Sequence, residues 1–398
     1  MVTLIGMGSG KWEALSAQAQ QAVRSAGLVF GAKRLLAGLP ADCMARQFAF
    51  YQPADILETL AQNLGQDAAV LYSGDTGFYS GASGLLTPLR ALGIPARVYP
   101  GVSSIQLLSA ALGRPWQDWK LVSAHGCACD PVAECMMNRS VFFLTGGTET
   151  PASLCQKLTD AGMGEAHGVV GENLGTEAEA IRYGSAAELA GQSFAPLSVL
   201  LVENFDLPQL RAPGFPDESF IRSEVPMTKQ EVRAAALAKL AVMPTDTLWD
   251  VGAGTGSVSV ELALAAPKGR VYAVECEPDA CELIRKNRAK FQTYNLILIE
   301  GRAPDVLADL PAPDAVFIGG TKGGMEAVLD EVLGKNPNAR ICISAIALET
   351  LGAAIAALTA RGLTAEVTQI AVSRTKPAGR LHLLMANNPI FLITGTRK

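Results

Sequence analysis

Strand-like apolar runs alternate with stretches of helical period along most of the chain. In the first half, "VTLIGMG" and "AAVLYSGD" alternate with "WEALSAQAQQAVRSAG" and "FYSGASGLLTPLRALG". In the second half, "DTLWDVGAG", "RVYAVEC" and "LILIEG" alternate with "VSVELALAAP" and "PDACELIRKNRAKF". Such alternation is typical of α/β folds, so we expect both halves to contain largely parallel sheets.

The two α/β patterns are separated by "DLPQLRAPGFPDESFIRSEVP", which carries four prolines and has neither period. A proline-rich stretch without a period predicts a linker. A chain of 398 residues is also too long for one ordinary core. We therefore expect one domain over residues 1–206, a linker over 207–224 and a second domain over 225–398. No repeat relates the two halves, so they are expected to be distinct folds.

Composition narrows the class of protein. Apolar residues make up 49% of the chain and charged residues 18%, which favours an enzyme with large interiors. We see no apolar run long enough to span a membrane and no signal peptide, so a cytoplasmic enzyme is expected. The net charge of −5 does not support binding to nucleic acid.

The cysteines cluster once, in "HGCACDPVAEC", where Cys127, Cys129 and Cys135 follow His125. This segment lacks the paired two-residue spacings of a zinc site, and the chain has three histidines. We favour free thiols in a loop over a metal or redox centre, and predict no metal.

A glycine loop follows the strand "TLWDV" and precedes a helix: Gly252, Gly254 and Gly256. Glycines at such a turn let a ligand approach the helix N-terminus. The last spacing is two residues, not the three of dinucleotide-binding loops. Asp250 precedes the loop, and Glu275 ends the next strand, placed to accept hydrogen bonds from ribose hydroxyls. The combination resembles the Rossmann-like methyltransferases that bind S-adenosylmethionine (SAM); a nicotinamide cofactor is the less favoured alternative.

The following strands supply further candidates. Arg302 and Ala303 follow "LILIEG", where the resemblance places the adenine. The fourth strand runs into "GGTKGG", where Lys322 is placed to meet a substrate carboxylate. Upstream, "PMTKQEVRAAALAKL" predicts a helix capped by Thr228 with Glu231 as its capping-box partner. Together with "EGRAPDVL" and "DAVFIGG", this segment resembles the decarboxylating precorrin methyltransferases of corrin biosynthesis over about Val225 to His382.

The first half carries its own series of loops at strand ends. Gly74 and Asp75 end one strand, and "VYPGVSS" supplies a second group: Pro100, Gly101, Ser103 and Ser104. Singly these are ordinary turn signals. In this order, with "LVSAHGC" and "GENLGTEAEAI", they resemble the tetrapyrrole methylase family over about residues 2–204. That family binds SAM in a cleft between two α/β lobes. Ser9 and Thr76 stand where the family often has proline, and Cys127 where arginine commonly follows "HG".

The resemblances imply one SAM per domain and methylation of a reduced precorrin-6 at meso carbons 5 and 15. They also imply loss of carbon dioxide from the acetate on carbon 12, giving precorrin-8. Because decarboxylation delivers electrons toward carbon 15, we expect both steps in the C-terminal half and carbon-5 methylation in the N-terminal half. Alternatives are the same fusion acting on cobalt-containing precursors, a methyltransferase for another substrate such as RNA or a small amine, or a non-catalytic SAM-binding protein.

A polycarboxylate tetrapyrrole needs cations to orient it. Lys229 and Lys322 rank first because they lie in the motif segments. The further candidates are Arg222, Arg233, Arg374, Lys376 and Arg380. His125 is a candidate acid or base, and Glu172 is interpreted as a helix-start cap in preference to a proton acceptor. Both families tend to self-associate, so a homo-oligomer is expected.

Overall fold

The structure is a computed structural model that describes residues 1–204, 207–208, 212–321 and 323–397. Contacts divide the described residues into two compact units. The first comprises residues 1–129, 140–159 and 164–203, and the second comprises residues 130–139, 160–163 and 204–398. In these residues no helix has both the length and the apolar character needed to cross a membrane.

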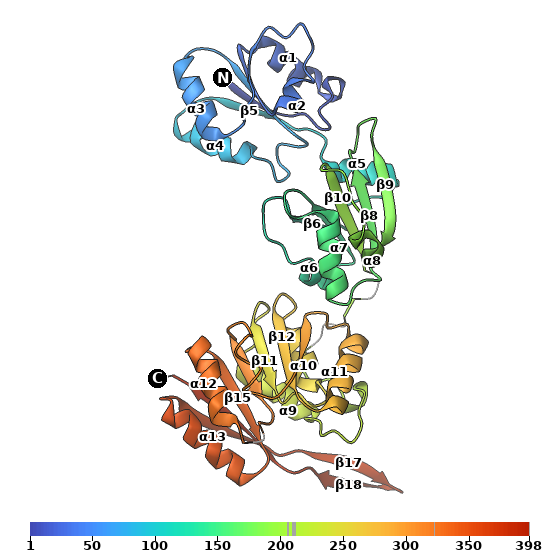
Figure 1. Ribbon diagram of the computed structural model, residues 1–398, viewed down its shortest axis with the longest axis vertical. Coiled ribbons are helices and arrows are strands. Elements are labelled where there is room, and N and C mark those ends of the chain that lie inside the picture. The colour runs from blue at the N-terminus through green and yellow to red at the C-terminus, as the bar shows by residue number, and fades with distance from the viewer. Residues whose placement is uncertain (205–206, 209–211, 322, 398) are drawn as a thin grey trace. The chain divides into compact units, whose positions relative to one another are not determined.

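A parallel sheet of order β3-β2-β4-β1-β5 opens the first unit (Figure 1). Its elements are β1 (Val2–Gly6), a 3-10 turn (Trp12–Ala14), α1 (Ala17–Ser25), β2 (Leu28–Phe30), α2 (Lys33–Leu36), β3 (Arg46–Phe48), α3 (Pro53–Gln62), β4 (Ala68–Tyr72), α4 (Ala82–Ala91), β5 (Ala96–Tyr99) and α5 (Ser104–Leu112). β1 and β4 are buried throughout, and are apolar apart from Thr3 and the terminal hydroxyl of Tyr72, because helices cover both faces of the sheet. α1 and α2 pack on one face, and α3 and α4 pack on the other.

The second sheet of this unit has the order β6-β7-β10-β8-β9. The elements of this stretch of chain are β6 (Lys120–Ser123), α6 (Pro131–Met137), β7 (Ser140–Leu144), α7 (Pro151–Asp160), β8 (His167–Glu172), β9 (Ala180–Ser185), α8 (Ala186–Ala190) and β10 (Ser198–Glu203). Only the β6–β7 pair is parallel among its described pairings. The expectation of largely parallel sheets is therefore wrong here. Strands joined by a short turn, as β8 and β9 are, must pair antiparallel.

The second unit contains a sheet of order β13-β12-β11-β14-β15-β19-β16, with β19 antiparallel to both neighbours. Its elements are a 3-10 turn (Asp217–Ser219), α9 (Gln230–Leu240), β11 (Thr247–Val251), α10 (Ser257–Ala265), β12 (Arg270–Glu275), α11 (Pro278–Phe291), β13 (Leu296–Glu300), β14 (Ala315–Ile318), α12 (Met325–Lys335), β15 (Arg340–Ala345), α13 (Leu348–Ala360), β16 (Thr364–Ile370) and β19 (Ile390–Thr396). The sheet has a hydrophobic core on each face. One core packs against α9, α10 and α11, and the second packs against α12 and α13. The α/β class expected for both halves is confirmed.

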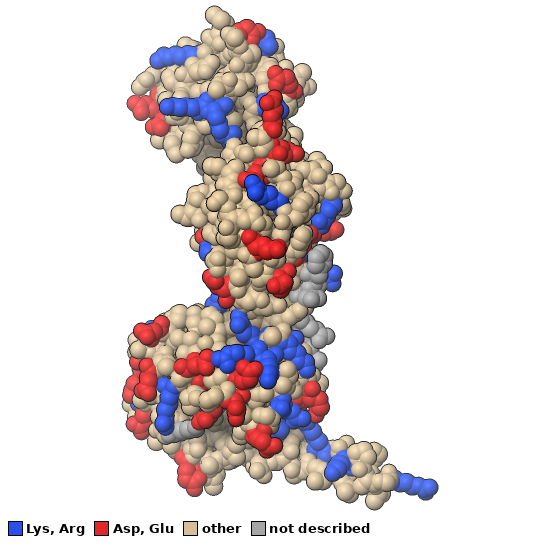
Figure 2. Space-filling view, turned by 45° about the vertical axis from the view of Figure 1, so that its right-hand side comes forward, with Lys and Arg blue, Asp and Glu red and all other residues tan. Residues whose placement is uncertain are grey.

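Strands β17 (Ser373–Ala378) and β18 (Leu381–Ala386) form a separate antiparallel hairpin. It projects from the C-terminal unit in Figure 1. Figure 2 shows blue side chains near the free end of this hairpin, where Lys376 and Arg380 lie. The hairpin therefore presents its cations outside the seven-stranded sheet.

The start of α9 differs from the sequence interpretation. Its N-cap is Lys229, without a side-chain capping bond. Asp217 caps the helix instead, since its carboxylate accepts a hydrogen bond from the Gln230 N–H at 2.9 Å. Glu231 forms a bidentate pair with Arg374 at 2.8 and 2.9 Å. Thr228 and Glu231 therefore form no capping box, because Asp217 binds the first N–H of the helix and Arg374 binds the Glu231 carboxylate.

Arg233 is a fully buried residue of α9, and it donates hydrogen bonds to Asp217 at 2.9 Å and to Glu261 at 2.8 Å. Glu261 also accepts from the backbone N–H groups of Gly214 and Phe215. The interpretation of Arg233 as a substrate-orienting cation is wrong, because its guanidinium is consumed by this internal cluster. The segment expected to be a linker is accordingly anchored in the C-terminal core.

Replacing Arg233 with methionine should lower the free energy of unfolding of the C-terminal unit by about 3–5 kcal/mol, since two buried carboxylates lose their counter-charge. Urea unfolding, with hydrogen exchange of β11 and β12 amides as the local reporter, measures this change. Arg285→Met is the control, because Arg285 and its partner Glu300 are about half exposed and the pair should contribute little. Equal effects of the two substitutions would contradict the argument.

Candidate functional site

Three strand ends meet in the first sheet of the N-terminal unit. Gly8 and Gly74 exchange backbone hydrogen bonds of 3.1 and 2.9 Å. A Cβ added to Gly101 would lie 2.3 Å from the Gly74 carbonyl oxygen and 2.5 Å from that of Gly6. The structure therefore brings the predicted glycines of β4 and β5 together at a place where no side chain fits.

The polar residues of these loops have local roles. The Asp75 carboxylate accepts a hydrogen bond from the Gly77 N–H at 3.0 Å and so shapes the turn. Ser103 is the N-cap of α5 and Ser104 its first residue. The Ser103 N–H donates to Gln106 Oε1 at 2.8 Å, while Pro100 stays exposed. These contacts establish a rigid loop cluster; a ligand role for its members stays a prediction.

A hollow of about 420 Å³ lies beside the end of β7 in this unit. Thr145 and Gly146 line one part of it, and Phe194 and Ala195 line another. His125 is exposed, and its Nδ1 lies 3.3 Å from the Thr145 carbonyl oxygen. The sequence analysis missed this hollow, since its residues are ordinary small and apolar ones.

Glu172 ends β8 and caps no helix, so that interpretation is wrong. Its carboxylate accepts hydrogen bonds from the Ala195 N–H at 2.7 Å and from Arg182 Nε at 2.6 Å. Burial alone raises the pKa of this carboxyl, but the Ala195 and Arg182 hydrogen bonds outweigh it and lower the pKa. A charged Glu172 therefore fixes the loop that lines the small hollow.

The glycine loop of the C-terminal unit connects β11 to α10. Gly252, Gly254 and Gly256 have φ of +74°, +55° and +75°, a region that side chains disfavour. A Cβ on Gly252 would also lie 2.2 Å from the Gly320 carbonyl oxygen. The sequence must therefore place glycine here for β11 and β14 to end side by side.

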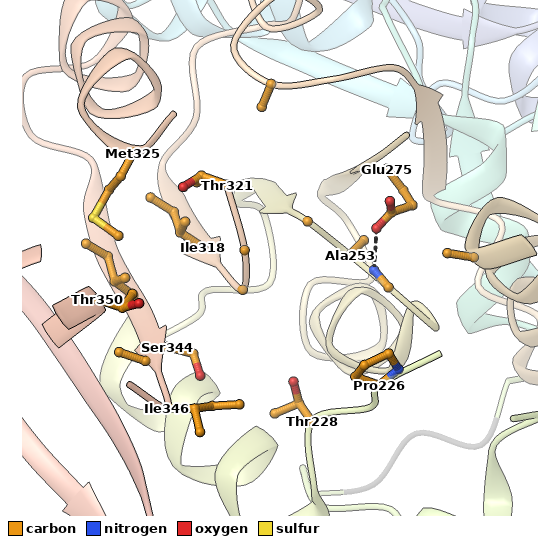
Figure 3. Close-up of a pocket in the computed structure, with 18 of the residues that line it drawn as sticks. Pro226, Thr228, Ala253, Glu275, Ile318, Thr321, Met325, Ser344, Ile346 and Thr350 are labelled. Atoms are coloured by element: carbon orange, nitrogen blue, oxygen red, sulfur yellow. Dashed lines mark hydrogen bonds between the residues drawn. The ribbon is translucent and has the colours of Figure 1, made fainter. Parts of the chain in front are cut away.

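Glu275 ends β12 beside this loop, with 9% of its surface exposed. Its carboxylate accepts hydrogen bonds from the N–H groups of Gly254 and Cys276, both at 2.8 Å, and of Glu277 at 3.0 Å (Figure 3). Ionised carboxylates have about four acceptor sites, so at least one stays available to a hydroxyl group. Three N–H donors hold the carboxylate in a fixed orientation at the cavity wall.

Asp250 lies beneath the same loop and does not line the cavity. It is 1% exposed and accepts a hydrogen bond from Ser259 Oγ, while its Oδ1 has no partner. Burial raises its pKa to about 7, against the Ser259 hydrogen bond, with Glu275 adding to the rise. Asp250 therefore supports the loop from below, and its contact with a cofactor stays a prediction.

Glu275 lines a cavity of about 1480 Å³ in the C-terminal unit, and Asp250 lies behind the loop that forms part of its wall. In Figure 3, Glu275 and Pro226 lie on one side of the cavity, and Met325 and Thr350 lie on the opposite side. The predicted residues Arg302 and Ala303 are among the lining residues. The remaining lining combines apolar and hydroxyl side chains, namely Ile318, Thr321, Ser344 and Ile346, and includes the carboxylates Glu326 and Glu349, which neighbour Met325 and Thr350 in the sequence. No short motif marks these far-side residues, so the sequence analysis missed them.

Among the cations in the described part of the chain, Lys229 and Arg302 line the cavity. Lys322 lies outside the described residues, although its neighbours Thr321 and Gly323 line the cavity. The other predicted cations outside the core do not line it: Arg222, Arg374, Lys376 and Arg380. His125, Cys127, Cys129 and Cys135 belong to no group of metal-ligand type among the residues that the structure describes.

Each half matches a protein family of its own. Residues 1–190 match the family described as tetrapyrrole (corrin/porphyrin) methylases, and residues 219–397 match the precorrin methyltransferase domain. A curated precorrin-6Y C(5,15)-methyltransferase (decarboxylating) from Sinorhizobium sp. is 32% identical over 83% of this chain and 81% of its own length. A probable cobalt-precorrin-6B C(15)-methyltransferase (decarboxylating) from Pyrobaculum calidifontis is 46% identical over 46% of this chain and 95% of its own.

A crystal structure of precorrin-6Y C5,15-methyltransferase from Geobacter metallireducens aligns with a TM-score of 0.46 and 37% identity. The aligned region covers 48% of this chain and 100% of the Geobacter chain. Fold, glycine loop and family matches define a methyltransferase with two domains. The chain belongs to the precorrin-6Y C(5,15)-methyltransferase (decarboxylating) family, and SAM is the methyl donor that this family implies.

Replacing Asp250 with asparagine should flatten the dependence of stability on pH. The pKa of Asp250 rises from 3.8 unfolded to about 7 folded, so between these values the folded chain holds a proton that the unfolded chain has lost. Wild-type stability should therefore fall from pH 4 to pH 7, by up to about 4 kcal/mol. Urea unfolding at pH 5 and pH 8 tests this. The prediction is wrong if the free energy of unfolding changes between the two pH values by the same amount in the Asn variant as in the wild type.

Proposed function

We propose that the C-terminal half methylates carbon 15 of reduced precorrin-6 and removes carbon dioxide from the acetate on carbon 12. The N-terminal half methylates carbon 5, and the product is precorrin-8. The observation that carries the C-terminal assignment is the large cavity at the glycine loop. Single-ligand pockets usually measure about 300–1,000 Å³, so about 1480 Å³ supports a site for a cofactor and a large second ligand together.

The residues at this loop fit SAM. The glycines leave the end of β11 open to a nucleoside, and Glu275 keeps acceptor capacity for a ribose hydroxyl. SAM, when bound, supplies a methyl group already activated on a sulfonium. This chain need only align it with an electron-rich carbon and exclude water. No side-chain nucleophile is required, because the tetrapyrrole's conjugation makes the carbon nucleophilic.

Lys229 and Arg302 are the described cations placed to orient substrate carboxylates. We propose Lys322 as a third. The apolar side chains of the far wall, Ile318 and Ile346, suit the tetrapyrrole faces and exclude water. When the acetate loses carbon dioxide, the bonding electrons enter the conjugated system and are delivered to carbon 15, which then takes the methyl group. This coupling supports both steps occurring in one half.

The N-terminal half is proposed to bind a second SAM at the loops of Gly74 and Gly101, with His125 as its candidate acid or base. The tetrapyrrole methylase match over residues 1–190 supports this. Cobalt-bound substrate is the second candidate, because the Pyrobaculum relative carries that activity in its name. Comparing rates with metal-free and cobalt-bound substrate separates the two. Cytoplasmic location and absence of nucleic-acid binding stay predictions.

The full chain carrying Gly101→Val should add one methyl group and still release carbon dioxide. The chain carrying Gly252→Val should add one methyl group without that release. Each valine meets backbone atoms within 2.5 Å of its Cβ, so it closes one loop. Product masses and released carbon dioxide are the measurements. If the Gly252→Val variant still releases carbon dioxide from the substrate, decarboxylation belongs to the other half.

We also propose a homo-oligomer in which the β17–β18 hairpin contacts a second copy. Exposed apolar side chains on β18 support this: Leu381, Leu384 and Met385 are 67%, 73% and 51% exposed. A strand with this many exposed apolar side chains is typical of an interaction surface. The double substitution Leu381→Lys and Leu384→Lys should lower the sedimentation coefficient of the assembly. Identical sedimentation of the variant and the wild type would exclude the hairpin as the interface.

A further inference from the structure

Asn287 is a fully buried amide on α11 whose hydrogen bonds join two distant segments. Its Oδ1 accepts from the Ile221 N–H at 2.8 Å, and its Nδ2 donates to the Ile221 carbonyl at 3.0 Å. The same Nδ2 donates to the carbonyl of Thr255, in the glycine loop, at 2.9 Å. One side chain therefore ties the chain ahead of α9 to the loop that is proposed to hold SAM.

The segment that Asn287 holds is residues 214–229, which we call the strap. The strap has little regular structure and is fixed by side chains of the core. At its start, Glu261 accepts hydrogen bonds from the Gly214 and Phe215 N–H groups. The ring of Phe220 stacks on that of Phe291, with the ring centroids 4.8 Å apart. Between Phe220 and the start of α9, the two hydrogen bonds of Asn287 with Ile221 connect the strap to the residue that also binds the glycine loop.

The end of the strap lies over that loop. A Cβ on Gly254 would be 3.3 Å from the Pro226 carbonyl oxygen and 3.9 Å from Val225 Cγ1. Residues 225–229 line the cavity, and Figure 3 shows Pro226 and Thr228 on the side facing Ala253. The position of the strap therefore sets the width of the cavity beside the glycine loop.

We propose that Asn287 is a positioning residue for the cofactor. By fixing Ile221 to Thr255 it holds residues 225–229 at the distance that closes the cavity around SAM. This inference rests on the proposed function of the cavity. Asn287 lines no part of the cavity itself, so it acts through the strap and the loop and not by contact with ligand.

The chain offers a matched control in Asn295. This asparagine is also fully buried, and its Nδ2 donates to the carbonyls of Ala263 and Ala266 at 3.0 and 2.9 Å. None of these partners belongs to the strap or to the glycine loop. Asn287→Leu and Asn295→Leu both remove a buried amide at similar volume. Because the Asn295 Oδ1 has no hydrogen-bond partner, Asn295→Leu should lower stability by less than Asn287→Leu, and it controls for the loss of a buried amide outside the strap.

The two variants and the wild type, as full chains, are compared in SAM-dependent carbon dioxide release. Asn287→Leu should raise the KM for SAM about tenfold, the equivalent of one net buried hydrogen bond, with a smaller change in kcat. Asn295→Leu should leave this KM within about twofold. Methylation at carbon 5 should keep its KM in both variants. Asn287→Ala, which removes the same hydrogen bonds without inserting a branched side chain, should repeat the effect and serves where the leucine variant fails to fold.

Hydrogen exchange with and without SAM separates the two levels of inference. In the wild type, SAM should protect residues 252–256 and the strap together, and in Asn287→Leu it should protect the strap less. If SAM protects neither in the wild type, the proposed function of the cavity fails and this inference with it. If SAM protects both but the two leucine variants share one KM and one protection pattern, Asn287 is merely structural and only the inference is overturned.

Discussion

The closeness of neighbouring strand ends is the constraint on which both halves depend. In the N-terminal unit, a Cβ on Gly101 would stand 2.3 Å from the Gly74 carbonyl oxygen; in the C-terminal unit, a Cβ on Gly252 would stand 2.2 Å from that of Gly320. Parallel strands end at a common edge, where ligands of open α/β sheets bind. Glycine there removes the side chain that would otherwise fill the ligand's space. Two unrelated folds have thus met the same steric requirement with the same residue.

Two carboxylates at the C-terminal loop illustrate how environment separates chemically similar groups. Glu275 receives three backbone N–H donors, which fix the orientation of its carboxylate at the cavity wall. Asp250, a few residues away in the sheet, is buried with a single hydroxyl donor, and burial raises its pKa to about 7. One carboxylate is suited to face a ligand, and the other supports the loop that carries it.

The strap shows how irregular backbone can be held as firmly as a helix. Its backbone groups bond to the buried side chains of Glu261 and Asn287, its own Asp217 caps α9, and its phenylalanines enter the core. A buried charge cluster such as Arg233 with Asp217 and Glu261 contributes modestly to stability when intact, but it tolerates the loss of no member. The position of the cavity wall that the strap forms therefore depends on buried residues that do not line the cavity.

The sequence by itself determined the α/β class, the two-family organisation and the glycine loops, because these features depend on local period and on glycine spacing. The same local evidence failed at Thr228, Arg233 and Glu172. Asp217, Glu261 and Ala195 decide the roles of those groups through hydrogen bonds that span 13 to 28 residues of the chain. Only the tertiary structure brought the far wall to the cavity and placed Asn287 between the strap and the glycine loop. Their side chains carry no motif, and packing alone sets what they touch.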